Sequence, residues 1–273
     1  GLDVDIIEPG DNATTSMVAA GKADFGVSYQ EDVTYALTSE DPLPIKTIAT
    51  IIQHNTSGFV SLKSANINSV KDFEGKTYAG WGAPSEEAVI KAVMNEAGAD
   101  FNKLTIVGSD GSGIAGLSDE VGKNKVNLGW EFYGWAIIKA LQDGYDLNYM
   151  PLADLDSRLD YYTPVIITNN KMIKKNSDTV KKFMEATKKG YEYAIDHPNK
   201  AAEILHEDAL SDTDLKFLKE SQKYLSSQYA KDADSWGVMK DSVWNNYTDF
   251  MYETGLINKK IDAKDQYTNE FVK

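Results

Sequence analysis

The sequence predicts an α/β fold made of two lobes. Segments that alternate apolar and polar residues, as strands do, take turns along the chain with segments of helical periodicity. This order is typical of α/β proteins with parallel sheets. Two stretches, "AAGKADFGVSYQE" and "VGKNKVNLGWEFYG", also share one plan: a helix ends at Gly-Lys, and a short glycine-containing strand runs into aromatic residues and Gln or Glu. We therefore expect two lobes of similar topology, each presenting a polar and aromatic tip where ligands bind in open α/β sheets.

The first part of the chain is expected to supply four strands and one helix. Residues 2–7, "LDVDII", alternate as a strand does. A capped helix is predicted over 12–21, closed by a glycine, and the next strand over 23–29. The β-branched runs 45–53 and 58–63 predict two more strands, separated by the polar turn "HNTS".

The middle of the chain continues the alternation. A strand over 75–82 leads into a helix over 83–98, which has proline and acidic residues in its first turn and glycine at its end. Strands are predicted over 104–110 and over 126–129. The glycine-rich stretch 108–116 lacks the Lys-Ser/Thr ending of a phosphate loop, so we interpret it as a strand-to-helix loop.

The last part of the chain returns through one strand and then becomes helical. The strand is expected over 161–169. A long helix starts near Ser177 and ends at His197-Pro198, and further helices are signalled near Ser211 and over 242–255. The apolar stripe of the long helix consists of Val180, Phe183, Met184, Thr187 and Tyr191.

Composition bounds the possible functions. The 273 residues are 42% hydrophobic and 11% aromatic, enough to bury a core, so disorder is excluded. The net charge of −14 argues against nucleic acid and anionic membrane surfaces as partners. No run approaches the roughly 20 apolar residues of a membrane span. The absence of cysteine excludes disulfides, thiolate zinc sites and cysteine nucleophiles.

Two further counts concern ligands. Arg158 is the only arginine, which weakens any proposal of a carboxylate, sulfonate or phosphate ligand, although helix N-termini could substitute. The three histidines, His54, His197 and His206, show no shared ligand spacing, so no metal site is expected.

Several segments carry a family resemblance. In "AAGKADFGVSYQEDV", "SVKDFEGKTYAGWGAPSEEAVIKAVM", "VNLGWEFYGW" and "YYTPVIIT" the chain resembles type II periplasmic binding proteins, and more narrowly the NMT1/THI5-like solute-binding proteins of ABC importers. "QHNTSGFVSLK" and "WEFYGW" are similar to members that bind thiamine pyrimidine precursors of the formylaminopyrimidine type. Family members normally have a strand and a helix before a "GLDVDII"-like segment, and we expect these to be missing here.

The resemblance implies a domain organisation and a function. Residues 1–76 and 165–273 would form a discontinuous first lobe and 77–164 the second, with hinge crossings near Lys76 and Pro164. Closure of the central cleft would trap a small heteroaromatic solute, without catalysis or cofactor, and an ABC permease in the membrane would read the closed form. The resemblance also implies a monomer in an extracytoplasmic location, in the periplasm or on the cell surface through a lipid anchor.

The strongest candidate site residues are Trp130 and Glu131. A tryptophan face stacks on a flat aminopyrimidine, and a carboxylate accepts from its exocyclic amine. The alternative is that Trp130 packs in the second lobe and Glu131 is solvated. Tyr133 and Trp135 are expected to pack in the core where the next helix begins.

Other candidates lie at the equivalent tip and at a helix start. Tyr29, Gln30 and Glu31 end a strand of the first lobe, and the alternative is an ordinary strand end. Trp81 precedes a helix N-terminus at Ser85 and Glu86, whose free backbone donors could hold a polar ligand atom. The alternative there is that Ser85 is a simple cap and Trp81 a packing residue.

The last candidates flank the two crossings. His54, Asn55 and Thr56 lie between two strands and form either part of the site or only a polar turn. Tyr161 or Tyr162 would cap the cleft or pack at the hinge.

Alternatives remain for the ligand and for the class. Riboflavin, an alkylsulfonate or nitrate would fit the same fold. An enzyme resembling the THI5 pyrimidine synthases is disfavoured, because that activity looks to need a histidine group and a cysteine-rich motif, which this chain lacks.

Overall fold

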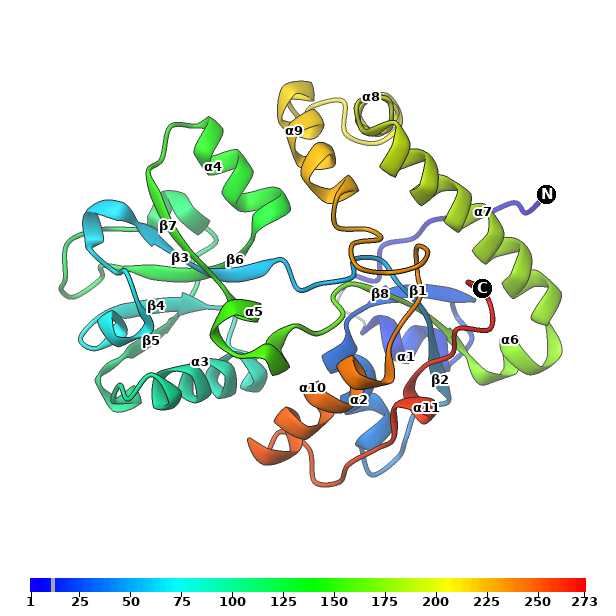
Figure 1. The fold of residues 1–273 in the computed structure, drawn as a ribbon, viewed down its shortest axis with the longest axis horizontal. Coiled ribbons are helices and arrows are strands. Elements are labelled where there is room, and N and C mark those ends of the chain that lie inside the picture. Colours follow the sequence, from blue (N-terminus) through cyan, green and yellow to red (C-terminus); the bar gives the residue numbers. More distant parts are fainter. Residues whose placement is uncertain (11–12) are drawn as a thin grey trace. The chain divides into compact units, whose positions relative to one another are not determined.

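The computed structural model describes residues 1–10 and 13–273 and divides the chain into two compact units (Figure 1). Unit 1 comprises Gly1–Asn55 and Asp160–Lys273, and unit 2 comprises Thr56–Leu159. The chain therefore passes between the units twice, as predicted. The first passage comes directly after Asn55 rather than near residue 76. The predicted boundary is too late because the strand that follows Asn55 pairs inside the unit 2 sheet.

The sheet of unit 1 has three strands in the order β1-β8-β2. They are β1 (Phe25–Ser28), β2 (Ile45–Thr50) and β8 (Val165–Asn169). The central β8 is antiparallel to both neighbours, so the prediction of parallel strands is wrong for this unit. The second passage of the chain precedes β8 and comes after Leu159, slightly earlier than the predicted Pro164.

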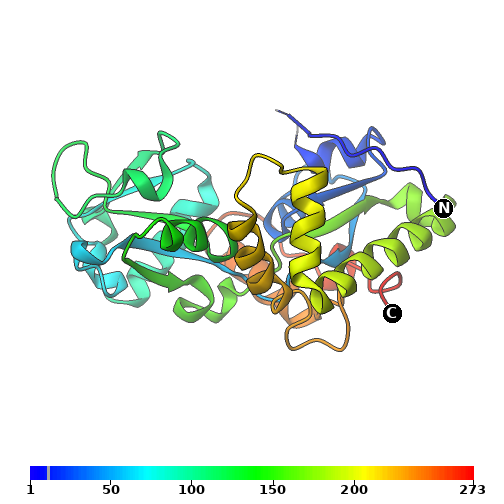
Figure 2. The same ribbon diagram turned by 90° about the horizontal axis from the view of Figure 1, so that it is seen from above.

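Helices cover this sheet and extend from it (Figure 2). They are α1 (Thr14–Ala19), α2 (Gln30–Thr38), α6 (Asn170–Lys175), α7 (Ser177–Asp196), α8 (Pro198–Asp208), α9 (Leu215–Ser226), α10 (Asp241–Glu253) and α11 (Ala263–Gln266). The predicted stripe of α7 is confirmed, because Val180 and Met184 are buried in a core with Ile48. The helix also ends where predicted, at His197, and Pro198 opens α8.

The first residues of the chain do not form the predicted strand. Residues 1–9 have no regular secondary structure, and Ile6 is 94% exposed. The alternating pattern is present, but a strand needs hydrogen-bonding neighbours, and none of the described residues supplies one. Asn12, the predicted start of the helix that became α1, lies outside the described residues.

The sheet of unit 2 has five strands in the order β5-β4-β6-β3-β7. They are β3 (Ser57–Leu62), β4 (Thr77–Gly80), β5 (Thr105–Gly108), β6 (Leu128–Phe132) and β7 (Leu147–Pro151). β4 runs parallel to β5 and β6, whereas β3 is antiparallel to β6 and β7. β6 begins and ends later than the predicted 126–129, so Trp130 and Glu131 lie within the strand and not beyond it.

Both faces of this sheet are covered by helices. Figure 1 shows α3 (Pro84–Glu96) and α4 (Ile138–Gln142) on opposite sides of the strands. Phe59 of β3 packs edge-on against Phe73, Tyr78 and Trp130. The next residue, Val60, points to the other face and packs with Ile137 and Ala140. Neighbouring residues of β6 are separated in the same way, which decides how the site is built. A short helix, α5 (Leu152–Leu155), follows β7.

No helix among the described residues has the length and apolar character needed to cross a membrane.

Candidate functional site

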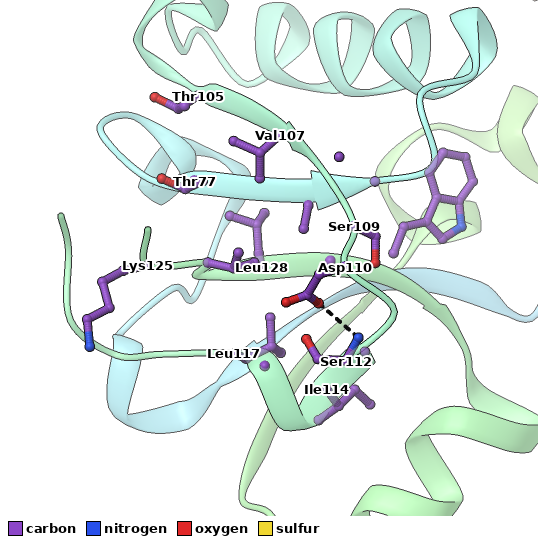
Figure 3. A pocket seen from close by; sticks show the side chains of 18 of the residues that line it. Thr77, Thr105, Val107, Ser109, Asp110, Ser112, Ile114, Leu117, Lys125 and Leu128 are labelled. Carbon is purple, nitrogen blue, oxygen red and sulfur yellow. Dashed lines mark hydrogen bonds between the residues drawn. The ribbon is translucent and has the colours of Figure 1, made fainter. Parts of the chain in front are cut away.

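Unit 2 contains a cavity of about 910 Å³ on one face of its sheet. Figure 3 shows Thr77, Val107 and Leu128 of three neighbouring strands beside Ile114 and Leu117 of the following loop. The loop is the glycine-rich stretch, which contains a short 3-10 helix over Gly113–Gly116. Asp110 shapes its start, because its carboxylate accepts a hydrogen bond from the Ser112 N–H at 2.9 Å. The wall at the other end is formed by Trp81, Trp130, Glu131 and Phe132.

The two tryptophans differ in exposure although their rings touch. Their centroids lie 5.2 Å apart with an interplanar angle of 62°. Trp81 follows the C-terminal end of β4 and is 57% exposed, whereas Trp130 is 9% exposed and packs on Phe59. No described residue accepts a hydrogen bond from the buried indole Nε1 of Trp130. Trp81 therefore offers a ring face, and Trp130 supports it and retains an unused donor.

Glu131 brings a carboxylate to this cavity. It is the neighbour of Trp130 in β6, so its side chain lies on the opposite face of the sheet, the face that Val60 also occupies. None of the described residues donates a hydrogen bond to the carboxylate, and burial raises the pKa of Glu131 above its ordinary value. A half-buried carboxylate in this condition can accept from a ligand, or donate to it when protonated.

The turn from β4 to α3 is organised by Glu86, not left open for a ligand. Glu86 is 2% exposed. Its carboxylate accepts hydrogen bonds from the Tyr78 hydroxyl, from the Trp81 N–H at 3.3 Å and from the Gly82 N–H at 2.9 Å. A side chain at Gly80 would overlap this carboxylate.

These bonds change the roles we assign around the turn. Glu86 fixes the turn that carries Trp81, so we assign it a structural position beneath the site. The predicted cap, Ser85, is buried at 3% exposure and does not line the cavity.

Two predicted residues of unit 1 bond to each other. The Gln30 N–H donates to the Tyr162 carbonyl at 3.0 Å, and the Tyr162 N–H donates to Gln30 Oε1 at 2.9 Å. Both side chains are buried, and the Tyr162 hydroxyl accepts from the Lys240 N–H at 2.9 Å. These contacts join the start of α2 to the segment before β8, so we leave both residues out of the site. The preceding Tyr29 is 46% exposed.

Glu31 stands in a cluster of tyrosines at the first turn of α2. Its Oε2 accepts from the Tyr247 hydroxyl at 3.2 Å and from the Tyr161 hydroxyl at 3.5 Å. The rings of Tyr161 and Tyr247 stack with centroids 4.0 Å apart. Burial and the Glu31 charge raise the pKa of both phenols. The same two causes raise the pKa of Tyr35 to about 12.

Tyr161 and Tyr247 are therefore neutral donors to one carboxylate, whereas the buried Tyr35 hydroxyl has no hydrogen-bond partner among the described residues. Tyr247 and Tyr35 were missed by the sequence analysis. Tyr247 lies 216 residues after Glu31 and appears in the sequence only as one apolar position of a helix.

His54, Asn55 and Thr56 are divided between the units. His54 contacts Asp160 and Asp232, and the Asn55 N–H donates to Asp160 Oδ1 at 2.9 Å, all inside unit 1. Thr56 begins unit 2, where its carbonyl accepts from the Tyr149 hydroxyl at 2.8 Å. These three residues are thus engaged by protein groups where the chain leaves unit 1, and none of them lines the unit 2 cavity.

Three other expectations can be compared with the structure. Tyr133 packs near Val60 as expected and contacts Tyr149, with centroids 5.4 Å apart. Trp135, in contrast, is 47% exposed, so the prediction that it packs in the core is wrong. It lies in a single wide π-helical turn, Tyr133–Ile137, which shifts its direction relative to an α-helix. Among the described residues no group of three His, Asp or Glu could hold a metal ion.

Comparison with known proteins places the chain in a family. The model of the NMT1/THI5 like family matches residues 1–201, so the chain belongs to this family. It is 27% identical over 211 residues to a formylaminopyrimidine-binding protein of Halalkalibacterium halodurans, covering 75% of this chain and 61% of that protein. It is 24% identical over 250 residues to the riboflavin-binding protein RibY of Chloroflexus aurantiacus, covering 86% and 67%. The chain thus spans about three fifths of the length of the first of these relatives.

A solved structure supports the fold. The alkanesulfonate-binding protein of Xanthomonas axonopodis pv. citri superposes with a TM-score of 0.68 at 12% identity, over 93% of this chain and 83% of that one. This likeness confirms the predicted periplasmic-binding-protein fold with two α/β lobes.

Proposed function

We propose that this chain captures a small heteroaromatic solute, a thiamine-related aminopyrimidine, for an ABC importer. In this proposal it acts as a monomer outside the cytoplasm, hands its ligand to a membrane permease and catalyses no reaction. Family membership and the formylaminopyrimidine-binding relative support the class. The chemistry of the unit 2 cavity supports the ligand.

One observation carries the ligand assignment: an exposed indole face and a carboxylate that accepts no hydrogen bond from the described residues lie at the same end of the cavity. Stacking of a flat ring on Trp81 contributes about 0.5–1.5 kcal/mol beyond the burial of area. The Glu131 carboxylate has already been partly desolvated by the fold, so a donor from the ligand meets an acceptor that has little water to give up. An aminopyrimidine supplies both a flat ring and amine donors.

The alternative of an anionic ligand has less support. Arg158, the only arginine, lies in unit 2 but forks onto Asp156, with N–O distances between 2.6 and 3.1 Å, and does not line the cavity. Lys125, at the far end of the cavity, is paired with Glu120 at 2.8 Å. Glu131 itself would repel an alkylsulfonate or nitrate near the tryptophans. Riboflavin is not disfavoured by this charge argument and remains the second candidate, supported by the RibY relative.

The Glu31 cluster of unit 1 is proposed as a second group that binds ligand. Tyr29, two residues before Glu31, is exposed, and the Tyr161 and Tyr247 hydroxyls both donate to the Glu31 carboxylate. In a two-lobed binding protein, ligand contacts from both lobes favour the closed form.

A thermal-shift panel tests the proposal. Three classes of compound would each be added to the protein: aminopyrimidines (formylaminopyrimidine among them), riboflavin and alkylsulfonates. A ligand at 100 times its Kd stabilises the folded protein by about 2.7 kcal/mol, which such a scan resolves. We expect the aminopyrimidines to raise the melting temperature most. A response to sulfonates alone, or no response to any pyrimidine, would reject the ligand assignment. Recovery of the ligand chemically unchanged after long incubation is expected, and its conversion would reject the non-catalytic role.

A further inference from the structure

The two connections of the chain are tied together where they leave unit 1. The outgoing segment over residues 50–54 bonds to the returning segment, because the Ile51 N–H donates to the Pro164 carbonyl at 3.0 Å. The same outgoing segment bonds to a loop over residues 228–238. The Thr50 N–H donates to the Gly237 carbonyl at 3.1 Å, and the Gln53 side chain donates to the Val238 carbonyl at 3.0 Å. The outgoing segment is thus held between the returning segment and the loop.

His54 ends this arrangement with one contact on each side. Its Nδ1 lies 2.6 Å from Asp160 Oδ2 on the returning segment. Its Nε2 lies 3.3 Å from Asp232 Oδ2 on the loop. The other oxygen of Asp160 accepts from the Asn55 N–H, which fixes the carboxylate toward His54. Only a protonated imidazole carries an N–H at both nitrogens, so the hydrogen bond to Asp160 and the ion pair with Asp232 are both favourable only in the charged form.

We propose that His54 is a proton-operated clamp on the two connections. When protonated, it bridges Asp160 and Asp232 and holds the 228–238 loop against the outgoing segment. When neutral, it keeps its proton on Nδ1 for Asp160 and presents the Nε2 lone pair to Asp232, so the side-chain contact with the loop is lost while the bonds from Thr50 and Gln53 remain. The inference concerns unit 1 alone and does not depend on which ligand the protein binds.

The charged groups around the ring favour the protonated form. The hydrogen bond with Asp160 raises the pKa of His54 above its ordinary 6.5, and this effect outweighs partial burial, which lowers it. Asp232 acts in the same direction as Asp160, while Lys231 opposes them. Because the folded-state pKa is raised, the stabilisation is complete below about pH 6.5 and is lost as the pH rises through the His54 pKa. The contact with Asp232 therefore weakens as the pH rises through the raised His54 pKa.

Proton NMR of the imidazole signals gives the first test, on the full chain without ligand. We expect the His54 signal to titrate above the ordinary histidine value, and Asp160→Asn and Asp232→Asn each to lower its midpoint. Asp232 has a left-handed backbone with φ of 58°, a conformation that asparagine also tolerates, so D232N should fold normally. His206→Gln, a change on α8 far along the sequence, is the matched control and should leave the His54 signal unmoved. A His54 midpoint at or below the ordinary value would overturn the proposal.

Hydrogen exchange of the peptide that covers 228–238 tests the loss of this contact. After correction for intrinsic rates, its protection is expected to be lower at a pH above the His54 pKa than at a pH below it, because the contact with Asp232 is lost. His54→Gln cannot titrate, so its protection should be the same at both pH values. Equal falls in the wild type and in His54→Gln, or no fall in the wild type, would show that His54 does not control the loop. Neither measurement uses a ligand, so failure of the ligand assignment leaves this test intact.

Discussion

The Glu131 carboxylate is proposed to bind ligand, but its burial lowers the free energy of unfolding at neutral pH. Its pKa is raised by burial, so the native state binds more protons than the unfolded state just above pH 4.5, and stability falls as the pH rises through this interval. Replacing Glu131 with Gln removes the buried charge. We expect the ligand-free E131Q chain to melt at a higher temperature than the wild type at pH 7, and the difference to vanish near pH 4. Each kcal/mol of relief corresponds to about 2–4 °C for a protein of this size. A scan at both pH values decides the matter, and a lower melting temperature for E131Q at pH 7 contradicts this account.

The same substitution should weaken ligand binding. A hydrogen bond to a charged group contributes about 1.5–3 kcal/mol, against about 0.5–1.5 for a neutral one. The amide of Gln also presents a donor where an acceptor is needed. Tyr133→Phe is the control, because Tyr133 packs against Tyr149 beside the site. With the best ligand of the panel, calorimetry should give a Kd for E131Q roughly tenfold or more above that of Y133F. Equal affinities would show that Glu131 is not the polar anchor.

The sequence predicted the location of some site residues and not the bonding of others. Glu131 and Trp81 could be nominated because strand ends collect site residues in α/β sheets. Gln30 and Tyr162 could not be read as a bonded pair, since 132 residues separate them and each alone looks like a site residue. Likewise, the sequence does not predict that the Glu86 carboxylate accepts hydrogen bonds from the Trp81 and Gly82 N–H groups of the preceding turn.

At the scale of elements, the turn between β4 and α3 depends on Glu86. In Glu86→Gln, the amide NH₂ replaces either Oε2, where it faces the Gly82 N–H, or Oε1, where it faces the Trp81 N–H and the Tyr78 hydroxyl. We expect a loss of about 1–3 kcal/mol in the free energy of unfolding, the cost of leaving buried polar groups unpaired. Urea unfolding measures it. Glu87→Gln is the matched control, because Glu87 is exposed, and the substitution should change stability little. Similar stabilities for E86Q and E87Q would contradict the structural role.

Helices and strands were predicted correctly where local sequence pattern sets their bounds. They were missed where pairing with other strands sets them. α3 and α7 are close to their predicted bounds because caps, glycine and proline mark their ends. β7 was not predicted, and the antiparallel direction of β8 was not either, because strand direction and partners are set by the whole sheet. The 2–7 segment has a strand pattern without a strand for the same reason.

At the scale of the whole molecule, two passages of the chain connect the two units, and we expect ligand binding to change the radius of gyration. If the ligand is held from both units, binding should favour a more closed form, and the radius of gyration measured by small-angle scattering should decrease. E131Q at the same ligand concentration should show a smaller decrease. An unchanged radius on saturation with a ligand that raises the melting temperature would show that binding occurs without closure.

The overall organisation was predictable in kind but not in its boundaries. The repeated pattern of Gly-Lys, a short strand and aromatic residues predicted two lobes. The family resemblance predicted two chain crossings between them. The first passage was placed late because β3 and the residues up to 76 look, in sequence, like a continuation of unit 1. Their membership in unit 2 appears only through the pairing of β3 with β6 and β7.

Because Trp81 and Trp130 are in edge-on contact at the cavity, their fluorescence can report ligand binding. Of the five tryptophans, these two share one environment at the cavity, while Trp236 and Trp244 are sealed in unit 1 and Trp135 faces solvent. A flat molecule settling on Trp81 would shift emission from the one pair and leave the sealed rings as a constant background. Occupancy could then be followed by intrinsic fluorescence, without a label, in a spectrum whose changing part comes from unit 2.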